Sequence, residues 1–501
     1  MPRFVSKVST LSEAFKTNRT EMLALTTKLG ELNHRAFHES EKRKPRFDER
    51  GQLTPRERLS RLLDPGLAFL EIGNMAGYLL DTDDQERSVP GGSVIAGIGF
   101  VAGARVVIVI DDSGINAGAM TQAGGYRLRR CQEIALAKKL PFIHLVESAG
   151  ANLMKYTVEG FVAGGGLFAN LARLSAAGIP VITVLHGAST AGGAYMPGLS
   201  DYVVAIRGRG KAFLAGPALL KAATGEVASE EELGGAEMHA SVSGLAEYLA
   251  EDDGHGLIIA REVVARLQWN ARCPRRENPM AAEPQYDSDE IAGIVPLDYR
   301  KPYDVREVVA RVVDGSEFLD FKPVYGASTV CLQAEVYGHG FGLLGNNGPI
   351  DPDGATKATQ FMQLCDQAQI PLVFFQNTTG YLVGAQYERA GMIKHGSKMI
   401  QAVTNVSVPR LTFMIGASFG AGNYGMCGRG YNPDFVFSWP NTKTGVMGGA
   451  QAARTMSQVM MAGAERRGAA MDAAQMKAQE AMLTQHFDGQ SDAFYTSGRM
   501  L

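Results

Sequence analysis

The 501-residue sequence has few cysteines, nearly balanced positive and negative charge, and no long apolar run. Its five cysteines, at positions 131, 273, 331, 365 and 427, are isolated, so they form no CxxC metal motif and suggest no disulfide framework. We expect buried thiols in a reducing compartment. The formal net charge is −3, with basic and acidic residues intermixed, which gives no electrostatic basis for binding nucleic acid.

No apolar run reaches the roughly 18 residues that a membrane-spanning helix needs, so the sequence predicts no membrane segment. The N-terminal stretch MPRFVSKVSTLSEAFKTNRTEM soon carries Glu13 and Glu21 and lacks the apolar core of a signal peptide. A cytoplasmic location is the default expectation, and a weak transit-peptide interpretation stays open. The length and the 45% apolar content favour two or three globular domains.

From Val94 onward, short apolar segments alternate with glycine-rich turns and amphipathic stretches. VVIVIDD, PFIHLVES and PVITVLHG have the composition of buried strands, and RLRRCQEIALAKKL has apolar residues at helical spacing. This alternation predicts α/β architecture. Near residue 270 the polar, proline-bearing segment WNARCPRRENPMAAEPQYDSDE predicts a crossing between two domains, 1–270 and 271–501.

The two halves repeat each other. HGASTAGGAYM (186–196) follows an apolar segment that begins at Pro180, and IGASFGAGNYGM (415–426) follows one that begins at Pro409, so the offset is 409 − 180 = 229 residues. KLPFIHLVESAGA and QIPLVFFQNTTGY match at an offset of 230, and a helical stretch precedes each. Order and spacing agree over roughly 90 residues, which predicts an internal duplication and two domains of one fold.

Small residues stand at the predicted entry to a helix in both copies: Gly192 and Gly193 in the first, Ala421 and Gly422 in the second. They let a ligand approach the backbone, whose first helical N–H groups have no partner within the helix. Two such groups can hold a developing oxyanion, worth about 3–4 kcal/mol per donor in other enzymes. The alternative is a tight packing turn, and repetition at matched positions favours the functional interpretation.

Five stretches carry a resemblance to a known family: STAGGAYMPGLSD, KAATGEVASEEELGGAEMHASVSG, GYLVGAQYERAGMIKHGSKM, SFGAGNYGMCGRGY and WPNTKTGVMGG. From about residue 12 onward the sequence resembles the carboxyltransferase (β) subunits of biotin-dependent acyl-CoA carboxylases, in the methylcrotonyl-CoA and geranyl-CoA branch. The resemblance implies two tandem crotonase-like α/β domains. The first, 1–270, would bind the acyl-CoA and the second, 271–501, the biotin, with active sites where halves of two subunits meet.

In this family Gly192 and Gly193 would hold the thioester oxygen of the substrate, and Ala421 and Gly422 the ureido oxygen of biotin. The other implied acyl-CoA contacts are Ala149, Gly150, Ala151, Gly164, Thr190, Ala191 and Tyr195, and the implied biotin contacts are Thr379, Gly380, Phe419, Gly420 and Tyr424. Carboxybiotin would release CO2, and its N1 would then remove a substrate proton, so neither a side-chain base nor a metal is implied. Glu147, His186, His239 and His395 are therefore better explained as structural hydrogen-bonding residues, and Lys221 and Lys394 as solvated or salt-bridged rather than CoA-binding.

Two motifs of a complete carboxylase are missing: a biotin-attachment lysine, since EAML at 480–483 lacks it, and a P-loop. A separate α subunit with biotin carboxylase and biotin carrier domains is therefore implied, around a homo-hexameric β core in an α6β6 complex. The absence of a zinc ribbon distinguishes the chain from the β subunit of the bacterial acetyl-CoA enzyme. Because the family continues past GRML at 498–501, we expect the second domain to lack its extreme C-terminus.

The substrate is predicted from Gly164, in FVAGGGLFANLARLSAAG, where methylcrotonyl-CoA members carry a bulky phenylalanine. A glycine would open the acyl pocket for geranyl-CoA or another long isoprenoid acyl-CoA, carboxylated at the γ-carbon of a 3-methyl-enoyl group. Ordinary loop variation is the alternative, with methylcrotonyl-CoA or another acyl-CoA as substrate. From other classes, a biotin-dependent decarboxylase subunit of a sodium pump stays open, whereas a crotonase-type hydratase or a scaffold would not need the second turn.

Overall fold

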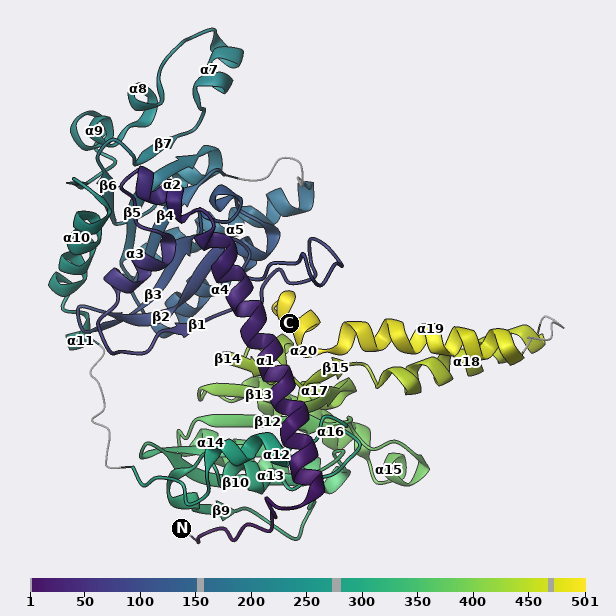
Figure 1. The fold of residues 1–501 in the computed structure, drawn as a ribbon. Coiled ribbons are helices and arrows are strands. Elements are labelled where there is room, and N and C mark those ends of the chain that lie inside the picture. Colours follow the sequence, from purple (N-terminus) through teal and green to yellow (C-terminus); the bar gives the residue numbers. More distant parts are fainter. Residues whose placement is uncertain (1, 151–156, 273–280, 467–472) are drawn as a thin grey trace. The chain divides into compact units, whose positions relative to one another are not determined.

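The computed structural model describes residues 2–150, 157–272, 281–466 and 473–501. The chain forms two compact units, each built around one sheet (Figure 1). The N-unit comprises Glu31–Arg275 and Ser497–Met500, and the C-unit comprises Met1–Gly30, Arg276–Thr496 and Leu501. The first thirty residues thus belong with the second half of the chain, whereas the division predicted at residue 270 placed them with the first.

In the described residues, the N-unit sheet has the order β1-β2-β3-β4-β5-β6-β8, with β7 beside β5. Neighbouring strands are antiparallel from β1 to β3 and parallel from β3 onward, including β7 beside β5. Its strands are β1 (Leu70–Glu71), β2 (Val94–Val101), β3 (Ala104–Asp111), β4 (Phe142–Ser148), β5 (Val181–Thr190), β6 (Tyr202–Ile206), β7 (Lys211–Phe213) and β8 (Tyr248–Ala250). The apolar runs of β3 and β4 are almost wholly buried, as expected for parallel strands covered on both faces.

The α-helices that lie wholly within this unit are α2 (Lys44–Glu49), α3 (Pro55–Leu62), α4 (Gln122–Lys138), α5 (Val158–Ala176), α6 (Tyr195–Gly198), α7 (Pro217–Thr224), α8 (Glu230–Gly234), α9 (Ala236–Met238), α10 (Asp253–Arg266) and α11 (Trp269–Arg272). The predicted helix within 127–140 is confirmed as part of α4. It begins earlier than its apolar pattern because the Thr121 side chain accepts a hydrogen bond from Gly124 N–H and so caps the first turn. It ends at Lys139, which has a left-handed backbone.

The C-unit sheet has the order β14-β13-β12-β11-β10-β9, with β15 beside β13, in the part of the chain that the structure describes. Its strands are β9 (Phe318–Asp320), β10 (Thr329–Val336), β11 (His339–Asn346), β12 (Leu372–Thr378), β13 (Arg410–Phe419), β14 (Phe435–Ser438) and β15 (Lys443–Gly445). The remaining helices are α1 (Glu13–Glu41), α12 (Ile291–Ile294), α13 (Val305–Val309), α14 (Pro352–Gln367), α15 (Ala385–Arg389), α16 (Met392–Asn405), α17 (Gly420–Gly425), α18 (Gly449–Arg466), α19 (Ala473–Ser491) and α20 (Ala493–Gly498). The helices α18 and α19 pack on each other as a hairpin (Figure 1).

The two sheets share one arrangement of strands, with β2 to β7 corresponding to β10 to β15, and β8 has no counterpart in the described part of the C-unit sheet. Phe142 of β4 lies opposite Val181 of β5, and Leu372 of β12 lies opposite Arg410 of β13, at offsets of 372 − 142 = 230 and 410 − 181 = 229. Both pairs also have a register shift at the same place, between Val146 and Ser148 and between Gln376 and Thr378. The predicted duplication of one α/β fold is therefore confirmed.

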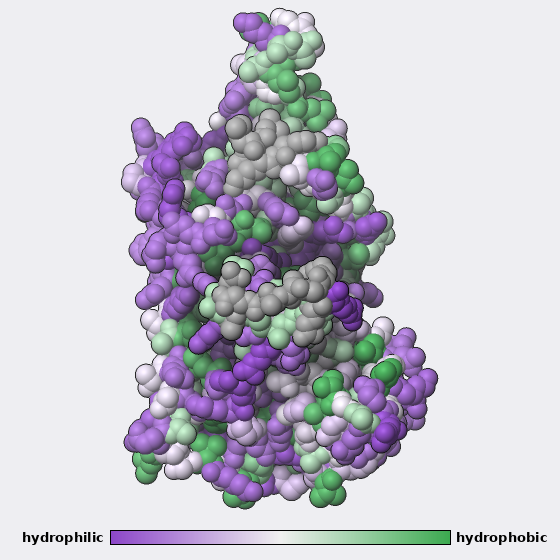
Figure 2. All heavy atoms as spheres, turned by 90° about the vertical axis from the view of Figure 1, so that its right-hand side faces the viewer, coloured by the Kyte–Doolittle hydropathy of each residue, from purple (hydrophilic) through white to green (hydrophobic). Residues whose placement is uncertain are grey.

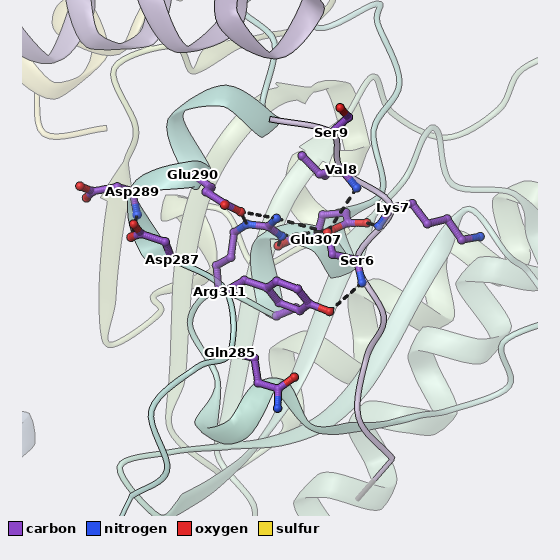
Figure 3. Close-up of polar contacts among 12 residues, drawn as sticks. Ser6, Lys7, Val8, Ser9, Gln285, Asp287, Asp289, Glu290, Glu307 and Arg311 are labelled. Atoms are coloured by element: carbon purple, nitrogen blue, oxygen red, sulfur yellow. Dashed lines mark hydrogen bonds and ion pairs between the residues drawn. The ribbon is translucent and has the colours of Figure 1, made fainter. Parts of the chain in front are cut away.

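The N-terminal segment joins the C-unit through the apolar packing of Phe15 and Met22 and through a set of polar contacts (Figure 3). The carboxylate of Glu307 accepts hydrogen bonds from Ser6 Oγ at 2.6 Å and from the backbone N–H of Lys7 at 2.7 Å. The buried Arg311 donates from Nη1 to the same carboxylate, from Nη2 to Ser6 Oγ, and from Nε and Nη2 to Glu290 Oε2. These contacts join residues some 300 positions apart in the sequence, so no local pattern could predict them.

Candidate active site

The first glycine-rich turn follows β5 in the N-unit. Ala191 has a left-handed backbone, with φ of 53°, and starts a short 3₁₀ turn over Ala191–Ala194 that continues into α6. Ser189 Oγ donates to the carbonyl oxygen of Gly193 at 2.8 Å, which ties the turn to the strand. The first N–H groups of a helical turn have no partner within it, and those of Gly192 and Gly193 stand at this position.

A second loop lies against this turn. Gly150, with φ of 84°, approaches Thr190 so closely that a Cβ at Gly150 would lie 3.2 Å from Thr190 Oγ1. The loop is fixed by hydrogen bonds from Gly150 N–H to Ser148 Oγ and from Met120 N–H to the Gly150 carbonyl. The structure thus brings together Gly150, Thr190 and the turn, with Ala149 exposed beside them. Ala151, also predicted as an acyl-CoA contact, lies outside the described residues.

Helix α5 borders the same turn. A Cβ on Gly192 would lie 3.6 Å from the ring of Phe168, and this ring meets Tyr195 edge-on at a centroid distance of 6.1 Å. Gly164 precedes Phe168 by four residues, so both lie on one face of the helix. Nothing among the described residues comes within 4 Å of a Cβ built on Gly164. Phe168 was not predicted, although its spacing from Gly164 is visible in the sequence.

The C-unit repeats this arrangement residue by residue. Gly420, at the position of Ala191, also has a left-handed backbone, with φ of 54°. The carbonyl oxygen of Gly380 accepts from Ile350 N–H, and Gly380 N–H donates to Thr378 Oγ1, as Gly150 does with Met120 and Ser148. Tyr424 is 50% exposed, against 51% for its counterpart Tyr195. Thr379 is exposed beside Gly380, as Ala149 is beside Gly150, and Phe419 packs edge-on against Tyr299.

The two turns differ in how tightly they are packed. A Cβ on Gly422 would lie 2.8 Å from Gly380 Cα and 2.9 Å from Thr378 Cγ2, distances that no real side chain adopts. The only described atom near a Cβ on Gly193, its counterpart, is Ser189 Oγ at 3.2 Å. Glycine is therefore required sterically at position 422, whereas at position 193 the backbone is more open.

Behind the N-unit turn lies a buried charge network. Arg58 Nη1 donates to Glu147 Oε2 at 2.6 Å, and Arg58 Nη2 lies 3.4 Å from Asp253 Oδ2. The other oxygen of Asp253 accepts from His186 Nδ1 at 2.7 Å. Burial alone would raise the pKa of Asp253, but the hydrogen bond from His186, together with the charge of Arg58 and the Leu53 N–H, lowers it to about 2. Burial, followed by the charge of Arg58, lowers the pKa of His186, so its imidazole is neutral.

The other side chains singled out in the sequence are explained structurally. His239 bonds through one ring nitrogen to Ser243 Oγ and through the other to the Ala212 carbonyl, both at 2.7 Å. His395 bonds to Thr356 Oγ1 at 2.8 Å. Lys221 and Lys394 are exposed. Glu147, His186, His239 and His395 thus all have hydrogen-bond partners, as the structural interpretation expects, and their lack of a catalytic role stays a prediction. Arg58 and Asp253 were not predicted, because nothing near them in the sequence points to their partners.

Four cysteines are described, at positions 131, 331, 365 and 427, and all are free and buried. Burial raises the pKa of each thiol, to about 12 for Cys131 and Cys331 and about 11 for Cys365 and Cys427, so these thiols are unreactive at neutral pH. Among the described residues, no cluster of three or more histidine, cysteine or acidic side chains has the arrangement of a metal site. The helices described there are all too short or too polar to cross a membrane.

The two units share one α/β fold and carry matched glycine-rich turns, and comparison with known proteins identifies the family. The model of the carboxyl transferase domain family matches residues 47–494, so the chain belongs to this family. It is 48% identical to a probable biotin-dependent acyl-coenzyme A carboxylase beta2 subunit of Mycobacterium tuberculosis, over 91% of this chain and 84% of the relative. It is 41% identical to the mitochondrial methylcrotonoyl-CoA carboxylase beta chain of Arabidopsis thaliana, over 98% of this chain and 84% of the relative.

Among solved structures, the crystal structure of the P. aeruginosa geranyl-CoA carboxylase beta subunit superposes with a TM-score of 0.92. It is 50% identical in sequence, and the match covers all of this chain and 92% of that one. The chain is thus a carboxyltransferase β subunit of the biotin-dependent acyl-CoA carboxylases, close to those of the methylcrotonyl-CoA and geranyl-CoA enzymes. Biotin and an acyl-CoA thioester are accordingly the cofactor and substrate class of the reaction.

Proposed function

We propose that this carboxyltransferase acts on a long, branched 3-methyl-enoyl-CoA, with geranyl-CoA as the leading candidate, and carboxylates its γ-carbon. The observation that carries the proposal is the open face of α5 at Gly164, where a Cβ would meet no described atom within 4 Å. The likeness to a geranyl-CoA carboxylase β subunit, at 50% identity, supports it further. Methylcrotonyl-CoA is the alternative, supported by the 41% identity to a methylcrotonoyl-CoA carboxylase chain.

The arrangement of α5 gives the acyl chain a direction. Phe168 packs over Gly192, and Gly164 lies one helical turn farther along the same face. A thioester oxygen held at Gly192 and Gly193 would place the start of the acyl chain beside Phe168 and its distal isoprene unit beside Gly164. A bulky residue at position 164 would close this path.

The turns are proposed to hold the oxygens that gain or carry negative charge. Backbone N–H groups of Gly192 and Gly193 stabilise the enolate oxygen of the thioester, and those of Ala421 and Gly422 hold the ureido oxygen of biotin. Carboxybiotin, when bound, supplies both the CO2 and the nitrogen base. Ala149, Gly150, Thr190, Ala191 and Tyr195 would border the acyl-CoA, and Thr379, Gly380, Phe419, Gly420 and Tyr424 the biotin.

The small residues of both turns fit this role. At Gly192 a Cβ would be in ordinary van der Waals contact with the Phe168 ring, at 3.6 Å, and glycine leaves the backbone itself open to approach. Tyr195 and Tyr424 are half exposed at matched positions, so both turns are open to a ligand in the single chain.

Substrate length is tested with Gly164→Phe. Because the aromatic ring would occupy the space for the distal isoprene unit, we expect the ratio of geranyl-CoA to methylcrotonyl-CoA carboxylation to fall at least ~100-fold. The wild type should retain some activity on the shorter substrate. Gly165→Ala is the matched control, because its Cβ also meets nothing within 4 Å and should leave the ratio unchanged. An unchanged ratio in Gly164→Phe, or a wild type inactive on geranyl-CoA, would refute the long-chain assignment.

The role of the first turn is tested with Gly193→Pro, which removes the proposed N–H donor. Carboxylation should fall at least ~100-fold, in line with the loss of one oxyanion donor. Gly193→Ala keeps the N–H, and its Cβ meets only Ser189 Oγ, so this control should retain most activity. Near-normal turnover by a folded Gly193→Pro protein would eliminate the assignment.

We also propose that the chain works as a homo-hexameric core with a biotin carboxylase and biotin carrier α subunit, as an α6β6 complex. Large apolar side chains are uncovered in the single chain, both at the start of α5 and around α7 at the upper end of the view in Figure 2: Val158, Phe161, Val162, Leu214, Leu219 and Val227. Exposed apolar side chains gathered in this way mark interaction surfaces. An active monomer in sedimentation with the α subunit would contradict the proposal.

A further inference from the structure

We propose that Arg58, Glu147, Asp253 and His186 form a clamp that positions the thioester-binding turn of the N-unit, with Glu147 as the residue through which it acts. This inference rests on the proposed role of Gly192 and Gly193. Glu147 is a positioning residue in this scheme, because it reaches the turn only through neighbouring residues.

The clamp is a closed circuit. It runs from Arg58 to Glu147 Oε2 at 2.6 Å, and from Arg58 to Asp253 at 3.4 Å. Asp253 continues to His186 at 2.7 Å, and His186 is followed in the chain by Gly187. The circuit closes where Glu147 packs on Gly187, since a Cβ there would lie 2.5 Å from Glu147 Cγ.

All four side chains are shielded from solvent, with Glu147 the most accessible at 16%. Ser113 Oγ donates a second hydrogen bond to Glu147 Oε2 at 2.9 Å, so the carboxylate is held from two directions. A largely buried carboxylate that accepts two hydrogen bonds has few side-chain rotamers available. Its position therefore fixes the backbone from which it projects.

That backbone leads directly to the turn. Glu147 stands at the register shift between β4 and β5, and the next residue, Ser148, pairs with Ser189. Ser189 in turn donates to the carbonyl oxygen of Gly193. A displacement of Glu147 is thus passed to the turn through one pair of neighbouring strand residues and one hydrogen bond.

The C-unit shows that this packing belongs to the duplicated design. Asn377 stands at the same register shift, and its Oδ1 would lie 2.3 Å from a Cβ on Gly416, the counterpart of Gly187. It also accepts a hydrogen bond from Ala417 N–H at 3.1 Å. Both units therefore use a polar side chain on a glycine to fix the strand end before the turn.

The test is the kinetics of Glu147→Ala and Glu147→Gln, purified with the α subunit. Removing the side chain should lower kcat at least ~30-fold while the KM for the acyl-CoA changes less than threefold, because binding contacts outside the turn remain. Gln can still fill the niche and bond to Arg58, so it should restore kcat to within ~5-fold of wild type. Val203→Ala, on β6, removes buried volume elsewhere in the N-unit and should lower the melting temperature without this kcat effect.

A second pair of variants approaches the clamp from the other side. Gly187→Ala should lower kcat because its Cβ clashes with Glu147. The double variant with Glu147→Ala should be more active than either single variant, because the second change makes the space that the first fills. The proposal is overturned if Glu147→Ala keeps its kcat within threefold, if KM rises instead, or if the double variant is simply additive. If Gly193→Pro is fully active, the proposed turn function itself fails, whereas an inactive Gly193→Pro with an unaffected Glu147→Ala refutes only the clamp.

Discussion

The N-unit and the C-unit share the geometry of their strand ends but differ in the charge behind them. Asp111, at the end of β3, accepts from the Glu147 N–H, and Asn346, at the end of β11, accepts in the same way from the Asn377 N–H. Where the N-unit has two carboxylates, the C-unit therefore has two neutral amides. His186 likewise corresponds to Ile415, one residue before the paired glycines. The duplicated fold preserves hydrogen bonds and packing at these positions, while their charge has diverged.

A second contrast lies on two corresponding helices, α4 of the N-unit and α14 of the C-unit. Arg127 stands six residues after the N-cap Thr121 of α4, and Lys357 six residues after the N-cap Asp351 of α14. Arg127 is buried and donates to the carbonyl of Ile72, to other main-chain carbonyls and to the Glu71 carboxylate. Lys357 is equally buried, but its Nζ has no hydrogen-bond partner among the described residues, and burial lowers its pKa.

The largest effect expected from this contrast is on stability. Arg127→Met would leave several carbonyl groups and Glu71 without their donor, so we expect a loss of about 3–5 kcal/mol in the free energy of unfolding. Lys357→Met removes a buried ammonium group that makes no hydrogen bond to the described residues, so it should be neutral or stabilising. Chemical denaturation of the two variants measures the difference. Equal destabilisation would show that the two cations have the same structural role.

The packing of the two turns gives the next prediction. Gly422→Ala forces a Cβ against the backbone of Gly380, which cannot move without displacing the loop. We expect overpacking of about 1–3 kcal/mol and a loss of carboxylation of at least ~10-fold. Among the described atoms, the Cβ of Gly193→Ala would meet only the Ser189 hydroxyl, so we expect carboxylation to fall less than threefold. If both variants behave alike, the tighter packing of the C-unit turn has no functional consequence.

These contrasts also show what the sequence could reveal. The duplication and both turns were predictable, because glycine and alanine recur at a fixed offset and their small side chains are themselves the signal. The clamp was not, since Arg58 meets Glu147 and Asp253 across 89 and 195 residues, and charge alone does not specify a partner. The association of residues 1–30 with the C-unit was missed for the same reason, because the polar contacts of Ser6 depend on the tertiary fold.

The charge difference predicts a pH dependence confined to one unit. The pKa of His186 is lowered in the folded state. Below the ordinary histidine pKa of about 6.5, the unfolded chain therefore binds more protons than the folded chain, and stability is lost as the pH falls through that value. The depressed pKa of Asp253, about 2, adds a loss only below pH 4. Between pH 7.5 and 5.5, hydrogen-exchange protection of β5 should therefore fall more than that of β13, which has Ile415 instead.

His186→Asn is the control for this experiment, because asparagine can donate to Asp253 but does not titrate. Asp112, whose pKa is raised by burial, acts in the opposite sense and is left in place by the substitution. The difference between wild type and variant thus isolates His186. Equal loss of protection in β5 and β13 would contradict the assignment of a neutral, buried imidazole.

The smallest effect concerns the residue that begins each turn. Ala191 and Gly420 have the same left-handed backbone, with φ of 53° and 54°, but only glycine adopts it without strain. Gly420→Ala should therefore destabilise the C-unit by about 1–2 kcal/mol, and its Cβ would also press on the Val446 carbonyl oxygen at 3.2 Å. Ala191→Gly removes the strain but adds freedom to the unfolded chain, so these terms largely cancel and its effect should stay within about 0.5 kcal/mol. Thermal denaturation of both variants measures the asymmetry, and a clear loss of stability in Ala191→Gly would show that the alanine methyl group has a packing role that the C-unit does without.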